Sequence, residues 1–184
     1  MISGKRLAAA AAGIALLGLS TSVSAELSTG AKAPEFATEG ALAGKEFSFD
    51  LDKALRKGPV VLYFFPKAFT EGCTQEAHAF AEAMSDFQAA GASVIGMSAD
   101  DVPTLKRFST VECRDKFPVA VASPSTIKAY DVAFVMNGKD LGLTSRTSYV
   151  IGQDGKIKLS YNNLDWRDHV KLTLAKVQEL HGKS

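Results

Sequence analysis

The residues of this chain that are best suited to chemistry lie around Cys73, in the segment Pro66–Glu76 (Pro-Lys-Ala-Phe-Thr-Glu-Gly-Cys-Thr-Gln-Glu). The apolar run Val60–Phe65 precedes this segment, and residues with helical spacing follow it. The pattern predicts that a buried strand ends at a proline and that a cysteine then opens a helix. The partial positive charge of a helix N-terminus favours the thiolate, which is the nucleophilic form of cysteine. We therefore predict that Cys73 is a reactive thiol.

Groups close to Cys73 in the sequence fit such a role. Thr70, three residues earlier, can aim its hydroxyl at the sulfur or at a bound substrate. Pro66 has no N–H, so it stops the strand and shapes the loop. The backbone N–H groups of Gly72 and Cys73 point into the same pocket if the helix begins here. Apolar walls are expected from three aromatic residues, Phe64, Phe65 and Phe69.

Arg146 is the second candidate for chemistry. It lies just before the apolar strand Thr147–Ile151, and the end of a strand is a suitable place from which to reach the N-terminus of a neighbouring helix. A guanidinium beside Cys73 would stabilise the thiolate and the charge that develops on a leaving oxygen. The alternative is an ordinary surface arginine, and the spacing alone favours that alternative.

The N-terminal residues have the pattern of a secretory signal peptide. Lys5 and Arg6 form a short positive region, and Leu7–Leu19 is an uncharged apolar run. A small-x-small pattern follows, so we predict cleavage after Ala25. A membrane anchor is the alternative, but the apolar run is shorter than the roughly 20 residues that a spanning helix needs. The sequence thus predicts a periplasmic or secreted protein without a membrane anchor.

The remaining residues, 26–184, have the length of a single domain with a substantial core. The whole chain has a formal net charge of +1 and no long basic run, which argues against a nucleic-acid partner or an anionic membrane surface. It contains only two cysteines, Cys73 and Cys113. Disulfides persist in an oxidising compartment, so these two residues can form one bridge there. The pattern leaves open whether that bridge is a structural staple or a redox pair.

Secondary-structure patterns place the chain in the α/β class. Apolar runs and alternation predict strands at 45–51, 60–65, 93–98, 118–122, 147–151 and 156–161. Helices are predicted at 52–57, 73–90, from 100 to before 116, at 123–130 and from 165 onward. The alternation indicates parallel central strands, and the final hairpin adds antiparallel strands at the edge. This order is that of a thioredoxin-like fold, with a central mixed sheet and helices on both faces.

Two predicted helices have an apolar stripe that should face the sheet. In the first, the stripe consists of Cys73, Ala77, Phe80, Met84 and Phe87. In the last, it consists of Trp166, Val170, Leu174 and Val177.

The motif Pro66-x-x-x-Thr70-x-x-Cys73 resembles the active-site motif of the peroxiredoxins. The context Tyr63–Ala68 is similar to the bacterioferritin-comigratory, or peroxiredoxin Q, subgroup, and Arg146 with the strand after it resembles that family's arginine segment. The resemblance implies a thiol peroxidase whose peroxidatic nucleophile is Cys73. It also implies that Pro66, Thr70 and Arg146 complete the site.

The resemblance further implies a resolving cysteine, and here the chain departs from many members of the subgroup. Those members carry that cysteine five residues after the peroxidatic one, where this chain has His78. Cys113 is then implied to resolve Cys73 through an intramolecular disulfide, late in the helix that begins near residue 100. A one-cysteine mechanism with a quiet Cys113 is the alternative. Hydrogen peroxide or an alkyl hydroperoxide is the implied substrate, a thioredoxin-like dithiol the implied reductant, and no cofactor or metal is expected.

Three other functions are less consistent with the residues. A thiol–disulfide oxidoreductase usually has Cys-x-x-Cys, but Glu76 stands where the second thiol would be. A metal site of Cys73, His78 and Cys113 is disfavoured because His78 is roughly 140° around the helix from Cys73. A structural disulfide in a binding protein explains both cysteines, but it does not explain the motif around them together with Arg146.

Expectations extend to four further residues. Glu76, one helical turn beyond Cys73, either orients Arg146 or faces water. His169 and His181 on the last helix are far in sequence from the site and are expected to be solvated. Trp166 is expected to serve packing.

Overall fold

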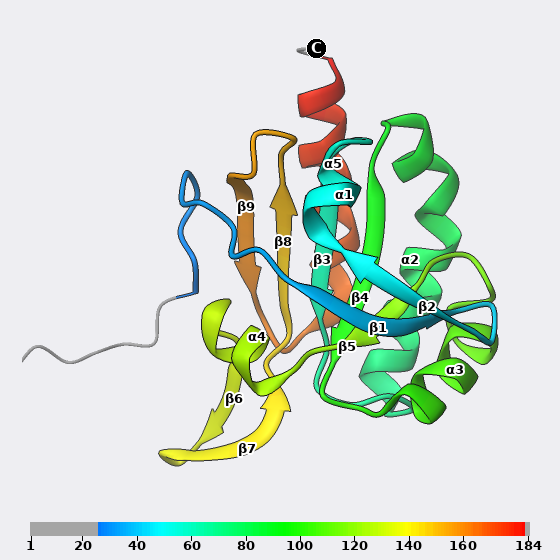
Figure 1. Cartoon of the computed structure of the whole chain (residues 1–184), viewed down its shortest axis with the longest axis vertical. Coiled ribbons are helices and arrows are strands. Elements are labelled where there is room, and N and C mark those ends of the chain that lie inside the picture. The colour runs from blue at the N-terminus through cyan, green and yellow to red at the C-terminus, as the bar shows by residue number, and fades with distance from the viewer. Residues whose placement is uncertain (1–25, 183–184) are drawn as a thin grey trace, which may run out of the picture.

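The computed structural model of the protein describes residues 26–182, and the predicted signal peptide lies outside these residues. Its centre is a seven-stranded mixed sheet with the strand order β2-β1-β5-β4-β3-β8-β9 (Figure 1). These strands are β1 (Ala37–Leu42), β2 (Lys45–Asp50), β3 (Val60–Phe64), β4 (Ser93–Ser98), β5 (Val119–Val121), β8 (Thr147–Ile151) and β9 (Ile157–Asn162). A separate two-stranded sheet contains β6 (Ala133–Met136) and β7 (Lys139–Thr144), which project from the bottom of the molecule in Figure 1.

The central strands β3, β4 and β5 are parallel, and β8 and β9 continue the sheet beyond β3 in antiparallel pairs. β3 is buried at all five positions because helices cover both of its faces. The helices are α1 (Leu51–Leu55), α2 (Glu71–Ala89), α3 (Val102–Val111), α4 (Pro124–Ala129), the 3₁₀ helix η1 (Trp166–Asp168) and α5 (His169–His181).

Two hydrophobic clusters lie on the two faces of the sheet. One packs α2, α3 and α5 against Val61, Tyr63 and Phe65 of the β3 region, and it contains both cysteines. The other packs α1 and the α4 region against the opposite side chains of β3, including Phe64. The predicted α/β class, mixed sheet and helices on both faces are therefore confirmed, whereas Phe64 lies on the face away from Cys73 and forms no wall of its pocket.

The structure differs from the prediction at three strands and one helix end. The prediction missed β1, β6 and β7. The sequence of β1 lacks a clear alternation of apolar and polar residues. The turn Asn137-Gly138 between β6 and β7 is a hairpin signal that the prediction did not use. Both turn residues have positive φ, at 51° and 73°. The helix α3 ends at Val111, so Cys113 lies just beyond the helix instead of late within it.

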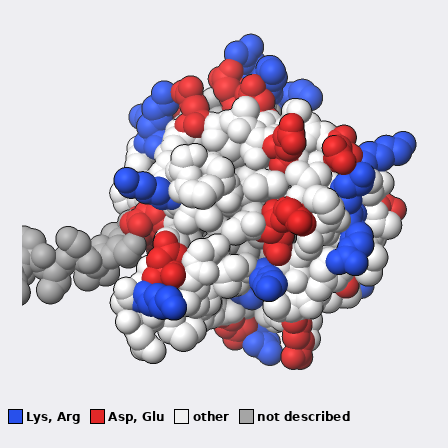
Figure 2. Space-filling view, turned by 60° about the horizontal axis from the view of Figure 1, so that its bottom comes forward, with Lys and Arg blue, Asp and Glu red and all other residues white. Residues whose placement is uncertain are grey.

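Charged side chains of both signs are interspersed on the face shown in Figure 2, and neither sign forms a continuous patch there. Among residues 26–182, no helix has the length and apolar character that crossing a membrane would require.

Candidate active site

The loop between β3 and α2 is fixed at both of its ends. Phe65, directly after β3, donates its N–H to Met97 of β4 at 2.9 Å, and Pro66 then ends the strand pairing because it has no N–H. The N–H of Ala68 donates to Oδ2 of Asp100 at 2.8 Å, and the same oxygen accepts from the Ser98 hydroxyl. Asp100 therefore ties the loop to the end of β4, a role that the sequence did not predict.

The residue just before Thr70 has an unusual backbone. Phe69 has a φ of 63°, in the left-handed region that a side chain such as phenylalanine rarely adopts. Its ring packs edge-on against Phe108 at 5.3 Å and lies beneath the Arg107 guanidinium, and these two contacts hold the conformation. This turn directs the chain into α2.

Cys73 is the third residue of α2 and is only 1% exposed. The helix N-cap is Thr70, but its side chain makes no capping hydrogen bond and donates instead to the carbonyl of Lys67 at 2.9 Å. The N-terminal N–H groups of α2 therefore remain available to an oxygen atom bound beside the sulfur. The predicted position of Cys73 at the start of a helix is correct, although α2 begins at Glu71.

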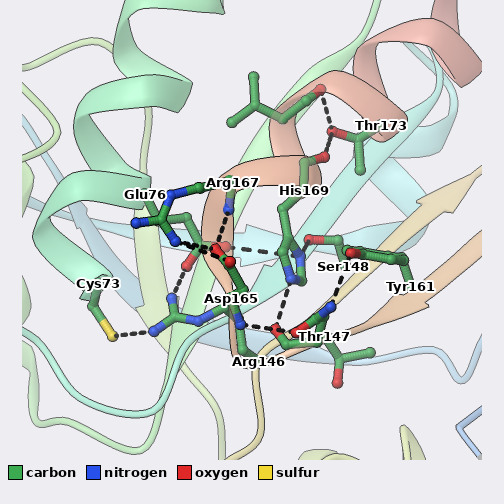
Figure 3. A network of polar contacts seen from close by, with 12 residues as sticks. Cys73, Glu76, Arg146, Thr147, Ser148, Tyr161, Asp165, Arg167, His169 and Thr173 are labelled. Atoms are coloured by element: carbon green, nitrogen blue, oxygen red, sulfur yellow. Dashed lines mark hydrogen bonds and ion pairs between the residues drawn. The ribbon is translucent and has the colours of Figure 1, made fainter.

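Arg146 reaches Cys73 from the chain before β8. The hydroxyl of Thr144 donates to the carbonyl of Phe65 at 2.7 Å, which joins this chain segment to the end of β3. Arg146 places Nη2 3.5 Å from Sγ of Cys73, donates through Nη1 to Oε2 of Glu76, and donates through Nε to the carbonyl of Leu164 at 2.9 Å (Figure 3). Three separate contacts thus fix the guanidinium beside the sulfur.

Glu76 is completely buried and is an ion-pair partner of Arg146. Burial raises the pKa of Glu76 to about 8, although the Arg146 guanidinium acts in the opposite direction. Of the two expectations for Glu76, the structure supports the one in which it orients Arg146, and it excludes the solvent-facing one.

The expectation for His169 was wrong. Its side chain is fully buried, its Nδ1 lies 2.7 Å from the Ser148 hydroxyl, and its Nε2 lies 2.9 Å from the carbonyl of Asn163. The inward face of α5 contains His169, Thr173 and Val177, and Val170 and Leu174 of the predicted stripe also pack against the same hydrophobic cluster. Trp166 also does more than pack, because its Nε1 donates to Gln75 of α2 at 3.0 Å.

Residues 29–160 match the model of the AhpC/TSA family. The chain belongs to this family. The chloroplastic peroxiredoxin Q of Suaeda salsa is 34% identical over 160 residues, which cover 86% of this chain and 72% of that protein. Among solved structures, peroxidoxin BcpB from Mycobacterium tuberculosis aligns with a TM-score of 0.73 and 28% identity, over 83% of this chain and 97% of that chain. Peroxiredoxin Q from Xanthomonas campestris aligns with a TM-score of 0.67 and 25% identity, over 78% and 90% of the two chains.

These similarities confirm three predictions from the sequence. The protein is a peroxiredoxin of the peroxiredoxin Q and bacterioferritin-comigratory group, it has the thioredoxin-like fold, and it is a thiol-dependent peroxidase.

Cys113 is a free thiol in this peroxiredoxin, as is Cys73. It is fully buried, and burial raises the pKa of its thiol well above the ordinary value, with the charges of Glu112 and Asp115 acting in the same direction. Polar contacts to α2 flank it on both sides, a hydrogen bond between Glu112 and His78 at 2.7 Å and an ion pair between Arg114 and Glu82 at 3.1 Å. The Cys113 thiol is therefore neutral and held in place in this conformation.

His78 contacts Glu112, and its side chain is about one-third exposed. The expectation that His78 is a solvated histidine on a helix is therefore met only in part. Within residues 26–182, no three His, Cys, Asp or Glu side chains gather closely enough to hold a metal ion.

Gly72 offers a local test of how tightly the guanidinium is positioned. A Cβ added there would lie 3.2 Å from Nη2 of Arg146 and 3.8 Å from the Trp166 ring. We expect Gly72→Ala to displace the guanidinium and to lower kcat/KM roughly three- to tenfold, because small misplacements of a positioning group are costly.

The measurement for this variant is steady-state peroxide reduction together with a thermal unfolding curve. Glu71→Ala changes an exposed residue of the same helical turn and serves as the matched control. A Gly72→Ala protein that is as active as Glu71→Ala would show that the guanidinium tolerates displacement.

Proposed function

We propose that Cys73 is the peroxidatic nucleophile and that Arg146 and the N-terminus of α2 stabilise its thiolate and the departing oxygen. The observation that carries this proposal is the 3.5 Å contact between Nη2 of Arg146 and Sγ of Cys73 at an uncapped helix N-terminus. A cation and free N–H groups beside the same sulfur favour the thiolate and a developing negative charge on oxygen. Thr70, whose hydroxyl oxygen retains free lone pairs, helps to align the peroxide, and Pro66 keeps the loop open.

The substrate of this reaction is a small peroxide, either hydrogen peroxide or an alkyl hydroperoxide. Cys73 is only 1% exposed, so bulky molecules have poor access to the sulfur. The sulfur attacks one peroxide oxygen, an S–O bond forms while the O–O bond breaks, and Cys73 becomes a sulfenic acid. Alkyl peroxide reduction is an activity of one structural relative, the bacterioferritin comigratory protein of Xanthomonas campestris, which is 25% identical to this chain.

Cys113 is the proposed resolving cysteine. It belongs to the same hydrophobic cluster as Cys73, on the α2 side of the sheet. Condensation of its thiol with the sulfenic acid yields a disulfide and water, and exchange with an external thioredoxin-like dithiol restores both thiols. Both residues are buried, so this step requires the first turn of α2 and the segment after α3 to move.

The test is the addition of one equivalent of hydrogen peroxide to the reduced protein, followed by mass spectrometry of the products. We expect rapid loss of the peroxide and a disulfide between Cys73 and Cys113. Rapid loss that leaves Cys73 as sulfenic or sulfinic acid beside a free Cys113 would establish a one-cysteine enzyme. Consumption with Cys73 unmodified would overturn the proposal.

We further propose that the protein is exported through a signal peptide that is removed after Ala25, as the charge and apolar pattern of the first residues predicts. The measurement is N-terminal sequencing of the protein from a cell fraction outside the cytoplasm. A mature N-terminus at Glu26 is expected. Recovery of the intact chain from the cytoplasm would contradict export.

A further inference from the structure

Two buried acids share one cation at the centre of the site. Arg146 contacts the sulfur of Cys73 through Nη2 and the carboxyl group of Glu76 through Nη1 (Figure 3). Cys73 is 1% exposed and Glu76 is 0% exposed, so solvent screens neither group. Within residues 26–182, Glu76 is the only fully buried carboxyl group, and Arg146 is the only cation that the structure bonds to either acid. One positive charge cannot fully balance two negative charges in a medium of low polarity.

Glu76 has a hydrogen-bond donor at only one of its two carboxyl oxygens. Oε2 accepts from Arg146, whereas Oε1 is buried without a hydrogen-bond partner. An ionised carboxylate is costly to bury unless donors satisfy both oxygens. A protonated carboxyl group fits this environment better.

The nearest group to Oε1 cannot supply the missing charge. Nδ1 of His169 lies 3.8 Å from Oε1, but burial lowers the pKa of His169 to about 4, so the ring is neutral. Its Nε2–H donates to the carbonyl of Asn163, which leaves Nδ1 as the acceptor of the Ser148 hydroxyl. The imidazole therefore offers no proton to Glu76.

The other titratable groups near Arg146 and Glu76 do not change the balance of one positive charge against two acids. The Tyr63 hydroxyl from β3 is fully buried, and burial raises its pKa well above the ordinary value, so it stays neutral. Asp165, before η1, faces Arg146 from the solvent side, is half exposed and is paired with Arg167. The buried charges that matter are those of Cys73, Arg146 and Glu76.

We propose that Glu76 is protonated while Cys73 is a thiolate, and that Glu76 ionises when Cys73 is oxidised. This inference rests on the proposed role of Cys73. Oxidation removes the negative charge from the sulfur, and Arg146 is then free to balance a carboxylate at Glu76. Glu76 acts through Arg146, so it is a positioning residue whose charge follows the state of the sulfur.

The net step balances in atoms and charge. The Cys73 thiolate, one hydroperoxide and the Glu76 carboxylic acid give the Cys73 sulfenic acid, one alcohol or water, and the Glu76 carboxylate. The sulfur loses two electrons to the O–O bond, and the alkoxide or hydroxide that leaves gains a proton. While Glu76 carries its proton in the reduced enzyme, the proton that it loses balances the one that the leaving oxygen gains, so there is no net uptake from solution.

The pH dependence of this exchange has a definite sign. In the reduced enzyme the pKa of Glu76 is about 8, so the carboxyl group carries its proton below that pH. Oxidation lowers this pKa because the Arg146 charge is no longer shared. Loss of the Glu76 proton on oxidation is therefore expected below pH about 8. Above that pH Glu76 is already ionised in the reduced enzyme, and the leaving oxygen draws its proton from solution.

The test is an infrared difference spectrum, oxidised minus reduced, of the Cys113→Ser protein treated with one equivalent of hydrogen peroxide near pH 7. The serine stops the reaction at the sulfenic acid, and mass spectrometry verifies oxidation of Cys73. We expect the carbonyl band of one protonated carboxylic acid per chain to be lost on oxidation. Glu76→Gln should remove this signal, whereas Glu82→Gln, at an exposed carboxylate of the same helix, should retain it.

Two results would overturn the inference while leaving Cys73 as the nucleophile: oxidation without any loss of the band, or the same loss in Glu76→Gln. A sulfenate that kept its negative charge would produce the first of these. If Glu76→Gln does not fold, carbon-13 labelling of glutamate in the protein that retains Glu76 assigns the band, because Glu76 is the only fully buried glutamate among residues 26–182. Failure of the peroxide to oxidise Cys73 would instead refute the proposed function, and this inference with it.

Discussion

Replacement of Cys73 by serine is expected to abolish peroxide reduction, with a loss of about 10⁴-fold or more in kcat/KM, because a hydroxyl is a far weaker nucleophile than a thiolate at neutral pH. The substitution changes one buried atom of similar size, so the fold should be retained. The sulfur packs among α2, β3 and Arg146, and a serine oxygen can still accept from Nη2. The measurement is peroxide consumption in the presence of a dithiol, together with a thermal unfolding curve.

Cys113→Ser is the matched control, because it removes the other buried thiol of the same cluster. We expect it to consume its first equivalent of peroxide at nearly the rate of the unaltered protein. Catalytic turnover through a disulfide should then stop. If Cys73→Ser kept its activity while Cys113→Ser lost the first turnover, the two roles would be exchanged. Equal loss in both variants would indicate a structural effect on the cluster.

Local sequence patterns were sufficient to place Cys73 at the start of a helix and to place the loop before it. Pro66, Thr70 and Cys73 are close in the chain, and the transition from an apolar run through a proline to helical spacing is a local signal. Arg146 is different, because its spacing alone favoured a surface residue. Only the family resemblance placed it at the site, since a strand end some seventy residues away can meet a helix in many ways.

The surroundings of His169 and Asp100 were not predicted because tertiary packing decides them. His169 and Thr173 are buried on α5 beside the apolar stripe, and the apolar residues of the stripe do not reveal that two polar neighbours are buried with them. At the start of α3 the cap is Asp101, which accepts from the N–H of Thr104. Asp100 is thereby left to hold the Ala68 N–H. Neither assignment follows from composition or periodicity.

Arg146→Lys is expected to lower kcat/KM for hydrogen peroxide by about 10²-fold, although it keeps the positive charge. The guanidinium binds the sulfur, the Glu76 carboxyl group and the Leu164 carbonyl through three different nitrogens. A lysine ammonium is a single point and cannot make all three contacts from the same backbone position. It should pair with Glu76 or approach the sulfur, but it should not hold the leaving oxygen in a fixed direction.

In Arg146→Lys, the rate of peroxide reduction should therefore fall while the fraction of Cys73 present as thiolate changes little. Ultraviolet absorbance of the thiolate is expected to change little in Arg146→Lys, while the rate falls, and Arg146→Met should lose both. Arg167→Lys alters an exposed arginine close to the same network and serves as the matched control, with activity within about twofold of the unaltered protein. If Arg146→Lys retained nearly full activity, positive charge alone would account for the role of Arg146. The three-point geometry would then serve the stability of buried Glu76 instead of catalysis.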